Sequence, residues 1–373
     1  MTLDTIEFTS ALHPGVAVQA VEPGRLTRVR AAYTTRFVAA ETDSRPHAFR
    51  LLTGADVVPQ PGDVLIARVT EIGKHTRLES PVSRRQLLFP GQEIMVAYGH
   101  RYAPDQFLAK VPASLEPCHL VAGGGVAGVV TAMHASINAP TAIEPVGLLA
   151  DDEGVVNLAR FAPLRSGRPA GESAFRPPVV AVLGSSMNSG KSTTLGCLVN
   201  GLTNAGLSVA AGKATGTGSG NDPNLFKDSG AVRAIDFTDY GHPTTFQLEY
   251  GEVRALLVSM VEELAADAPD AIVIEIADGL YQGETGRLLR DPVLHETVDR
   301  VLFASQDALG ASAGLQMLGA AGLEVAAVSG VLTASPLAAA EAGAVLDIPV
   351  VGTFDLCRAE VALGLLPARR GQA

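Results

Sequence analysis

The residues best suited to chemistry stand together in the stretch VVAVLGSSMNSGKSTTL, from Val179 to Leu195. A short apolar run leads into a loop, and Gly190, Lys191 and Ser192 open a predicted helix. The backbone amides of such a loop surround phosphate oxygens, and the positive end of the following helix attracts the same anion. We therefore predict that this loop binds the phosphates of a nucleotide.

The residues of this loop have separate predicted tasks. Lys191 reaches the β- and γ-phosphates as a catalytic residue, and the hydroxyl of Ser192 holds Mg²⁺. The alternative is a tight turn between a strand and a helix without any ligand, which the full motif disfavours. The predicted nucleotide-binding residues are Gly184, Ser185, Met187, Asn188, Ser189, Gly190, Lys191, Ser192 and Thr193.

A second apolar run, AIVIE, ends in Glu275. Mg²⁺ takes oxygen ligands, so a carboxylate at the end of a buried strand is typical of a magnesium site beside a phosphate-binding loop. We therefore predict Glu275 as a metal ligand and the nearby Asp278 as a catalytic residue. Asp278 and Glu284 bridge the metal or bind the substrate, or they only cap and solubilise their loop, and the sequence leaves these alternatives open.

Five residues separate Gly184 from Gly190, which gives the loop the form GxxxxxGKST. This loop resembles that of dethiobiotin synthetase and its relatives, among them cobyric-acid-type amidotransferases and several small-molecule kinases and ligases. The resemblance covers residues 179–355, which is about half of the chain. The partitioning ATPases share the sheet and loop architecture, but this chain lacks the extra lysine that they carry early in the loop.

The resemblance extends to the next strand end, in the stretch SVAAGKATGTG. It resembles the Lys-Pro-Val-x-Ser/Thr-Gly segment that places a lysine and a hydroxyl at the reacting phosphate. Lys213 matches the lysine, and Thr215 or Thr217 matches the hydroxyl, although Ala214 replaces the proline. A lysine there would stabilise charge on the transferred phosphoryl group. An exposed lysine on a flexible turn is the alternative.

The resemblance also includes the third strand end, where Glu275 matches the first residue of a Glu-Gly-Ala-Gly-Gly sequence. Ile276 replaces the first of these glycines, and Asp278 and Gly279 stand in place of the later ones, which implies a different substrate. In the relatives an aspartate from the region before this strand helps to hold the metal. His242 is predicted as a loop residue and not as a base. The aspartates available for the metal, among which nothing local selects one, are Asp222, Asp228, Asp236 and Asp239.

The elements that must position these residues follow from the pattern after residue 178. Apolar runs alternate with helix-length segments, as in repeated βα units. Uninterrupted apolar strands flanked by helices predict a mostly parallel, doubly wound α/β sheet of the P-loop NTPase type over residues 179–373. In such a sheet the loops after the strands face the ligand. The helices are expected at residues 192–204, 253–264 and 311–321.

The first part of the chain has a different pattern. Short apolar runs at residues 63–69 and 93–98 are bounded by Pro-Gly turns, which predicts a β-rich N-terminal domain, either a barrel or a sandwich, over residues 1–163. Residues 164–178 are predicted to form a linker. The GxGxxG within residues 119–128 has no surrounding βαβ unit and therefore indicates a glycine-rich hairpin or bulge. Residues 97–107 are predicted as a loop that faces a ligand or packs on its own domain.

The composition fits a globular chain of two domains, with 373 residues of which 47% are hydrophobic and 18% charged. The net charge of −11 disfavours sequence-independent binding to nucleic acid or acidic lipid. The start of the chain lacks a signal-peptide pattern and no uncharged apolar segment of membrane-spanning length occurs, which predicts a cytoplasmic protein. Cys118, Cys197 and Cys357 form no CxxC pair, so neither a disulfide framework nor a zinc site is indicated.

These features predict an enzyme that binds ATP and Mg²⁺ and transfers the γ-phosphoryl group to a small metabolite, as a kinase or an ATP-dependent ligase. One alternative is a regulatory or assembly NTPase that switches a protein partner. Another is a transferase that uses the fold for a different phosphate-bearing ligand. The expected partner is a small-molecule substrate, with no nucleic acid and no membrane, and the sequence leaves open a homo-oligomer, the substrate and the base of the nucleotide.

Overall fold

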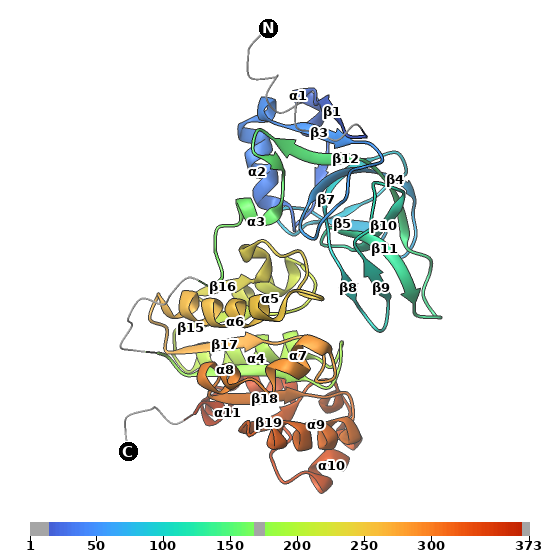
Figure 1. Cartoon of the computed structure of the whole chain (residues 1–373). Helices are drawn as coiled ribbons and strands as arrows, with labels where there is room; N and C mark the ends of the chain where they lie inside the picture. Colours follow the sequence, from blue (N-terminus) through green and yellow to red (C-terminus); the bar gives the residue numbers. More distant parts are fainter. Residues whose placement is uncertain (1–14, 168–175, 368–373) are drawn as a thin grey trace. The chain divides into compact units, whose positions relative to one another are not determined.

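The computed structural model of the chain describes residues 15–167 and 176–367. The described chain divides into two compact units (Figure 1). Unit 1 contains the residues up to Leu164 together with the stretches Thr217–Gly220 and Phe237–Phe246. Unit 2 contains the remaining residues. Of the predicted linker at residues 164–178, residues 168–175 lie outside the described chain.

Unit 1 is built around a mostly antiparallel sheet of 11 strands with the central order β1-β3-β12-β4-β7-β11-β9-β8. The predicted β-rich region is therefore confirmed. The strands β5 and β6 pair only with each other. The strands are β1 (Ala17–Ala20), β2 (Arg30–Ala31), β3 (Arg50–Thr53), β4 (Val64–Glu71), β5 (Arg77–Glu79), β6 (Arg85–Leu87), β7 (Glu93–Tyr98), β8 (Arg101–Tyr102), β9 (Phe107–Lys110), β10 (Cys118–Ala122), β11 (Val126–Met133), β12 (Thr141–Asp151) and β13 (Gly154–Val155).

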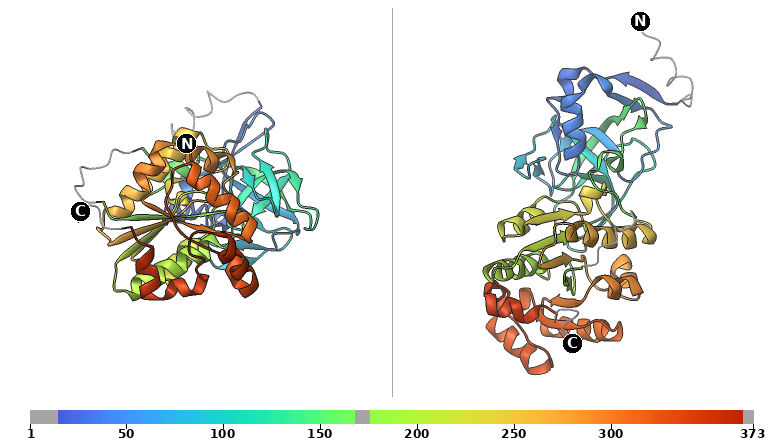
Figure 2. Two further views of the ribbon diagram at one scale, coloured as in Figure 1. Left: turned by 90° about the horizontal axis from the view of Figure 1, so that it is seen from below. Right: turned by 90° about the vertical axis from the view of Figure 1, so that its left-hand side faces the viewer.

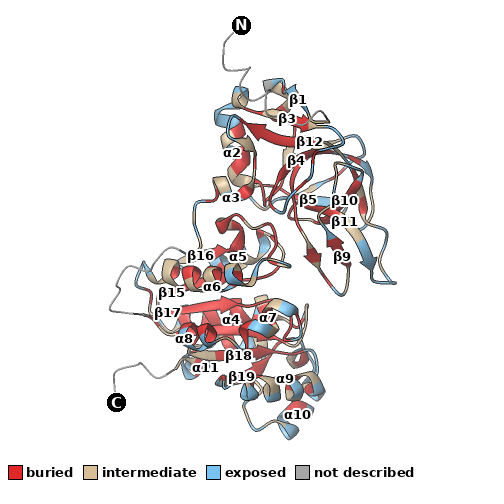
Figure 3. Ribbon diagram, in the orientation of Figure 1, coloured by how far each residue is buried: buried red, intermediate tan, exposed pale blue. Residues whose placement is uncertain are grey.

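The central strands of unit 1 are apolar on both faces. In β4, Leu65 and Ala67 belong to one hydrophobic core, whereas Val64 and Ile66 belong to another. Figure 3 shows the resulting burial along β4, β7 and β12. Because alternate residues of a strand point to opposite faces, a strand buried on both sides reads as an uninterrupted apolar run. This explains why β4 and β7 are recognisable in the sequence.

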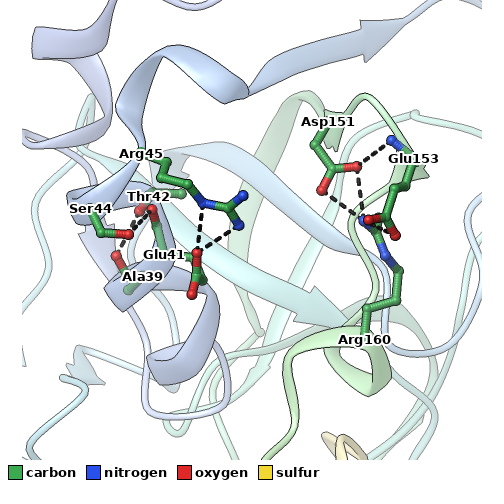
Figure 4. A network of polar contacts seen from close by, with 8 residues as sticks. All are labelled: Ala39, Glu41, Thr42, Ser44, Arg45, Asp151, Glu153 and Arg160. Atoms are coloured by element: carbon green, nitrogen blue, oxygen red, sulfur yellow. Dashed lines mark hydrogen bonds and ion pairs between the residues drawn. The ribbon is translucent and has the colours of Figure 1, made fainter.

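The short helices of unit 1 are less visible in the sequence. α2 (Arg36–Ser44) buries only Val38, Ala39 and Thr42, so its apolar stripe is narrow and the sequence does not predict it. α1 (Pro23–Leu26) and α3 (Leu158–Phe161) span four residues each. Figure 4 shows Arg160 of α3 bound to Asp151 at 2.8 Å and to Glu153 at 3.0 Å, which fixes α3 to the turn after β12.

Two sequence-predicted segments of unit 1 can be compared with the structure. Residues 119–128 form the β10–β11 hairpin, as predicted. Residues 97–107 are not a simple loop, because they contain the end of β7 and the short strand β8, which pairs with β9. Tyr98 and Phe107 are fully buried, so the aromatic residues of this stretch pack within their own unit.

The two later stretches of unit 1 are joined to each other, to β5 and to α2 by polar contacts. Thr217 forms an isolated antiparallel bridge with Thr244. Glu79 accepts hydrogen bonds from the Ser219 hydroxyl at 3.1 Å and the Gly220 amide at 3.2 Å. Arg36 donates to Asp239 at 2.6 Å. Parts of the chain that follow strands of the second unit therefore fold as part of the first.

His75 of unit 1 is expected to make the stability of the protein depend on pH. Burial first, and then the charges of Arg101 and Lys74, lower its pKa to about 3, while its Nδ1 lies 3.2 Å from the Leu120 carbonyl and its ring lies against Phe107. A histidine in an unfolded chain titrates near pH 6.5, so between pH 6.5 and 3 the unfolded state binds a proton that the folded state excludes. The stability that neutral His75 contributes is therefore complete above pH 6.5 and falls as the pH drops, by about 2 kcal/mol at pH 5.

We expect His75→Gln to lose about 2 kcal/mol less unfolding free energy than the native chain between pH 7.5 and pH 5. Urea unfolding at both pH values measures this difference. The exposed His47 provides the matched control His47→Gln, which should follow the native chain. Equal losses in the His75 variant and in the native chain would contradict the assignment.

Unit 2 contains a six-stranded sheet in which every pair is parallel, with the order β16-β15-β17-β14-β18-β19. The predicted parallel α/β fold is therefore confirmed. Its strands are β14 (Val179–Gly184), β15 (Val209–Lys213), β16 (Arg233–Asp236), β17 (Ala271–Glu275), β18 (Arg300–Ala304) and β19 (Val325–Ser329). Its α-helices are α4 (Lys191–Asn204), α5 (Asn221–Asp228), α6 (Tyr250–Ala265), α7 (Gly283–Leu288), α8 (Pro292–Thr297), α9 (Ala308–Ala320), α10 (Pro336–Val345) and α11 (Ala359–Leu365).

Helices cover both faces of this sheet, as Figure 2 shows. On one face, α4, α5 and α11 share a core with β14, β15 and β17. On the other face, Met260 of α6 lies against Gly212, and Gly314 of α9 lies against the ring of Phe303. The three predicted helices correspond to α4, α6 and α9, whose bounds differ from the predicted ones by at most three residues.

Candidate functional site

The candidate site lies where three adjacent strands of unit 2 end. β17 pairs with β14 on one side and with β15 on the other. In this register Glu275 is opposite Val182 of β14 and Lys213 of β15. Because parallel strands end at the same edge of the sheet, the loops after β14, β15 and β17 emerge together. All three loops contain site residues that the sequence predicts.

The loop after β14 is tightly packed. Gly190, which precedes α4, has a left-handed backbone with φ 96°. A Cβ atom on Gly184 would lie 2.2 Å from the Ser189 hydroxyl, so only glycine fits there. Ser185 donates its amide to the Ala304 carbonyl at 2.9 Å, which ties the loop to β18. Asn188, with φ 61°, is exposed and Ser189 is fully buried.

Lys191 begins α4 and turns back over the loop. Its Nζ donates to the Ser186 carbonyl at 2.8 Å, and only 6% of the residue is exposed. Burial lowers the pKa of Lys191, although the charges of Glu275 and Asp278 raise it in part. The structure thus places Asp278 close enough to act on this lysine by charge. An anion within the loop would favour the charged form of Lys191.

Glu275 connects the metal-binding and catalytic residues that the sequence predicts. One of its oxygens accepts from the Ser192 hydroxyl at 2.8 Å, and the other lies 3.2 Å from Nζ of Lys213. Lys213 also contacts Asp222 at 2.5 Å. Burial alone would lower the pKa of Lys213, but the charges of Asp222 and Glu275 outweigh burial and raise it. The four side chains form one buried polar cluster, which we call the Glu275 cluster.

The structure selects among the residues that the sequence left open. Of the four candidate aspartates, Asp222 lies in the Glu275 cluster, whereas Asp239 pairs with Arg36 in unit 1. Asp228 is exposed at the end of α5, and Asp236 is buried at the end of β16. The structure therefore brings one of the four to the predicted metal ligands.

The structure also places Thr215, Thr217 and Glu284 in different surroundings. Thr215 stays in unit 2 and donates to the Ala277 carbonyl at 2.5 Å, whereas Thr217 belongs to unit 1. Glu284 accepts the Gln247 amide at 2.7 Å, so it holds two segments of unit 2 together. His242 lies in the stretch Phe237–Phe246 of unit 1. The contact with the Gln247 amide gives Glu284 a structural role.

A cavity of about 300 Å³ borders the phosphate-binding loop. Gly190 and Thr193 form one side of it, and residues after β19 form the other. The hydroxyls of Thr353 and Thr333 lie 3.0 Å apart, and the neighbouring residue Phe354 is 79% exposed. Thr353 and Phe354 are not predicted from the sequence, although they end the apolar run IPVVGTF and residues at the ends of such runs often contact ligands.

The strand order, the glycine-rich loop at the start of α4 and the carboxylate at the end of β17 are those of one fold. Unit 2 has a P-loop NTPase fold. No family model matches this chain, and no curated protein matches it either.

Comparison with solved structures finds similarities at low sequence identity. The chain is 17% identical to the signal recognition particle receptor FtsY from Elizabethkingia anophelis, covering 53% of this chain and 57% of the receptor with a TM-score of 0.31. A nucleotide-binding protein in complex with ADP from Archaeoglobus fulgidus is 13% identical, with 51% and 92% covered and a TM-score of 0.36. The septum site-determining protein MinD complexed with Mg-ADP from Pyrococcus horikoshii OT3 is 12% identical, with 51% and 94% covered and a TM-score of 0.32.

The residues present fit a nucleotide and a magnesium ion. The Ser189 hydroxyl is buried inside the loop and has no hydrogen-bond partner in the described chain. The first amides of α4 have no carbonyl partner within the helix, as at every helix start. Ser192 and Glu275 offer the oxygen ligands that Mg²⁺ prefers. Among the described residues, no group of three or more His, Cys, Asp or Glu is arranged to hold a metal ion.

One further property can be read from the helices. In the part of the chain that the structure describes, none is both long and apolar enough to cross a membrane.

Proposed function

We propose that the chain is an enzyme that uses Mg-ATP to phosphorylate a small metabolite in the cytoplasm, as a kinase or as an ATP-dependent ligase of the dethiobiotin synthetase type. The observation that supports this most is the Glu275 cluster. It places a second lysine, Lys213, 3.2 Å from the carboxylate that also contacts Ser192. A lysine at the metal-binding carboxylate can neutralise charge that develops during phosphoryl transfer.

Each side chain has a task in this proposal. Loop amides and Lys191 hold the phosphates, and Lys191 exchanges the Ser186 carbonyl for a phosphate oxygen. Ser192 and Glu275 hold Mg²⁺, which neutralises phosphate charge when bound. Lys213 is shared between Asp222 and Glu275, so its charge is retained and its position fixed before substrate binds. Asp278 keeps Lys191 charged or orients the acceptor oxygen.

The base of the nucleotide would bind in the cavity beside Thr193. The threonine hydroxyls at its wall can hydrogen-bond to the edge of a base, and the exposed Phe354 ring can stack on its face. In the proposed reaction an acceptor oxygen of the metabolite bonds to the γ-phosphorus while the bond to the ADP oxygen breaks. A single-turnover assay over a panel of carboxylic acids and alcohols should find ADP formation that depends on one of them. Absence of any substrate-dependent ADP would contradict the proposal.

Glu275→Gln tests the metal-binding role. The amide keeps the size and can still accept from Ser192, but it loses the charge that faces Lys213. We expect the Mg²⁺ concentration for half-maximal turnover to rise about 10- to 100-fold, as for the loss of one charged interaction. A magnesium titration of ADP formation measures this.

Glu284→Gln is the matched control, because Glu284 carries the same charge and follows β17 in helix α7 but binds the Gln247 amide. Its magnesium dependence should stay close to that of the native chain. The same shift in both variants would show that Glu275 has no special relation to the metal.

A further inference from the structure

Unit 1 contains a cavity of about 370 Å³ that the proposed function does not use. Lys74, Arg77, Arg85 and Arg101 line it, together with the glycine turn between β10 and β11 and the stretch Thr217–Ser219. We call it the cation pocket. All its lining residues belong to unit 1.

The cation pocket concentrates positive charge in an acidic chain. Four cationic side chains line it against one carboxylate, Glu79, although the chain as a whole carries −11. That carboxylate is already engaged, because it accepts from Ser83, Ser219 and the Gly220 amide. These neutral donors fix the position of Glu79 and leave its charge in place, so the lining has a formal excess of positive charge, with four cations against one carboxylate.

Three of the cations lack ion-pair partners. Within the described residues, Lys74, Arg77 and Arg85 make no ion pair. Elsewhere in the same unit arginines are paired, as in Figure 4, where Arg45 binds Glu41 at 2.7 Å and Arg160 binds Asp151 at 2.8 Å. Like charges gathered without counter-charges repel one another, so an anion that enters the pocket relieves this repulsion.

The floor of the pocket is built from buried groups and closely packed backbone. Arg101 is only 6% exposed and receives support from Gln106, whose Oε1 accepts from it at 3.1 Å. A Cβ atom on Gly124 would lie 2.0 Å from the Gly218 carbonyl, so the two glycine segments touch directly. The lowered pKa of His75, caused first by burial and then by Arg101 and Lys74, is consistent with a positive field here.

We propose that the cation pocket binds a small molecule that carries at least two anionic groups, either carboxylates or phosphates. Guanidinium groups suit both, because their paired N–H donors match two oxygens of either anion. The volume admits a small metabolite and the net charge of the chain disfavours a polyanion such as nucleic acid. The site is separate from the phosphate-binding loop and does not depend on the proposed phosphoryl transfer.

Isothermal titration of the full chain without Mg²⁺, at fixed ionic strength, tests this with citrate as the polycarboxylate and fructose 1,6-bisphosphate as the phosphate probe. We expect one of them to bind with a stoichiometry of one. Arg77→Ala and Arg85→Ala should each weaken that binding about tenfold or more. Arg84→Ala removes the same charge from a residue next to Arg85 that does not line the pocket, and it should bind like the native chain.

The outcomes are distinct. Binding weakened by the Arg77 and Arg85 variants but not by Arg84→Ala supports the proposal, and the probe that binds identifies the anion. No binding of either probe at millimolar concentration would overturn it, as would equal weakening in all three variants. Lys191→Ala should leave the binding unchanged, and a loss in that variant would instead locate the anion at the phosphate-binding loop.

Discussion

Lys191→Ala should reduce nucleotide turnover about 10²- to 10³-fold, the cost of removing one positioned donor to a developing charge. The lysine is buried and its Nζ is held by the Ser186 carbonyl, so its position in the loop is fixed before any ligand binds. Alanine removes the positive charge and the long side chain that brings this charge to the phosphates. Steady-state release of ADP, together with calorimetric binding of Mg-ADP, measures the effect.

Lys227→Ala provides the control for this experiment. Lys227 is exposed in the last turn of α5 and makes no ion pair in the described chain, so its removal changes the net charge by the same amount. Turnover in this variant should stay close to native. If Lys191→Ala turns over nucleotide as fast as Lys227→Ala, unit 2 does not use its loop in the way proposed.

Lys213→Met should have the largest effect on stability. Lys213 contacts both Asp222 and Glu275, and the Glu275 side chain is only 2% exposed. The substitution leaves these two carboxylates without a cation between them. Removing one partner of a buried ion pair costs about 3–5 kcal/mol, because the remaining charge is desolvated and uncompensated. We therefore expect a loss of about 3 kcal/mol in EDTA, measured by urea unfolding.

Magnesium should return part of this stability. A divalent cation can balance the two carboxylates in place of the lysine, and any ligand of the folded state stabilises it by mass action. We expect 10 mM Mg²⁺, about the concentration of a usual assay, to stabilise Lys213→Met more than the native chain. Lys227→Met should show neither effect. An unchanged unfolding midpoint of Lys213→Met in EDTA would mean that the carboxylates do not depend on this lysine.

The sequence predicts the P-loop fold well because its signals are local and strong. Buried parallel strands appear as uninterrupted apolar runs, and GKST marks the start of α4 by its chemistry. The pairing of Lys213 with Glu275 follows from the strand order, in which β15 lies next to β17. Hydrophobic periodicity does not reveal strand order, whereas resemblance to a known family can suggest it. Asp222 could not be selected among four aspartates, because the choice depends on how α5 packs after β15.

The cation pocket shows what a single sequence does not reveal. Lys74, Arg77 and Arg85 are exposed, and each looks like an ordinary surface cation in the sequence. Only the folding of β5, β6 and β8 beside the glycine turn brings them together. Helix α2 is not predicted from the sequence for a related reason. It buries only three side chains, which are too few to show the hydrophobic periodicity of a helix.

The two units cannot be separated by a single cut in the chain, because unit 1 includes two stretches that lie between segments of unit 2. Unit 1 is completed by Thr217–Gly220 and Phe237–Phe246, which the chain reaches only after it has begun the sheet of unit 2. A gene fragment that stopped at Leu164 would therefore encode a sheet without the partners of Glu79 and Arg36. During synthesis unit 1 is therefore complete only after Phe246 has been added, when the remainder of unit 2 from Gln247 onward is still to follow.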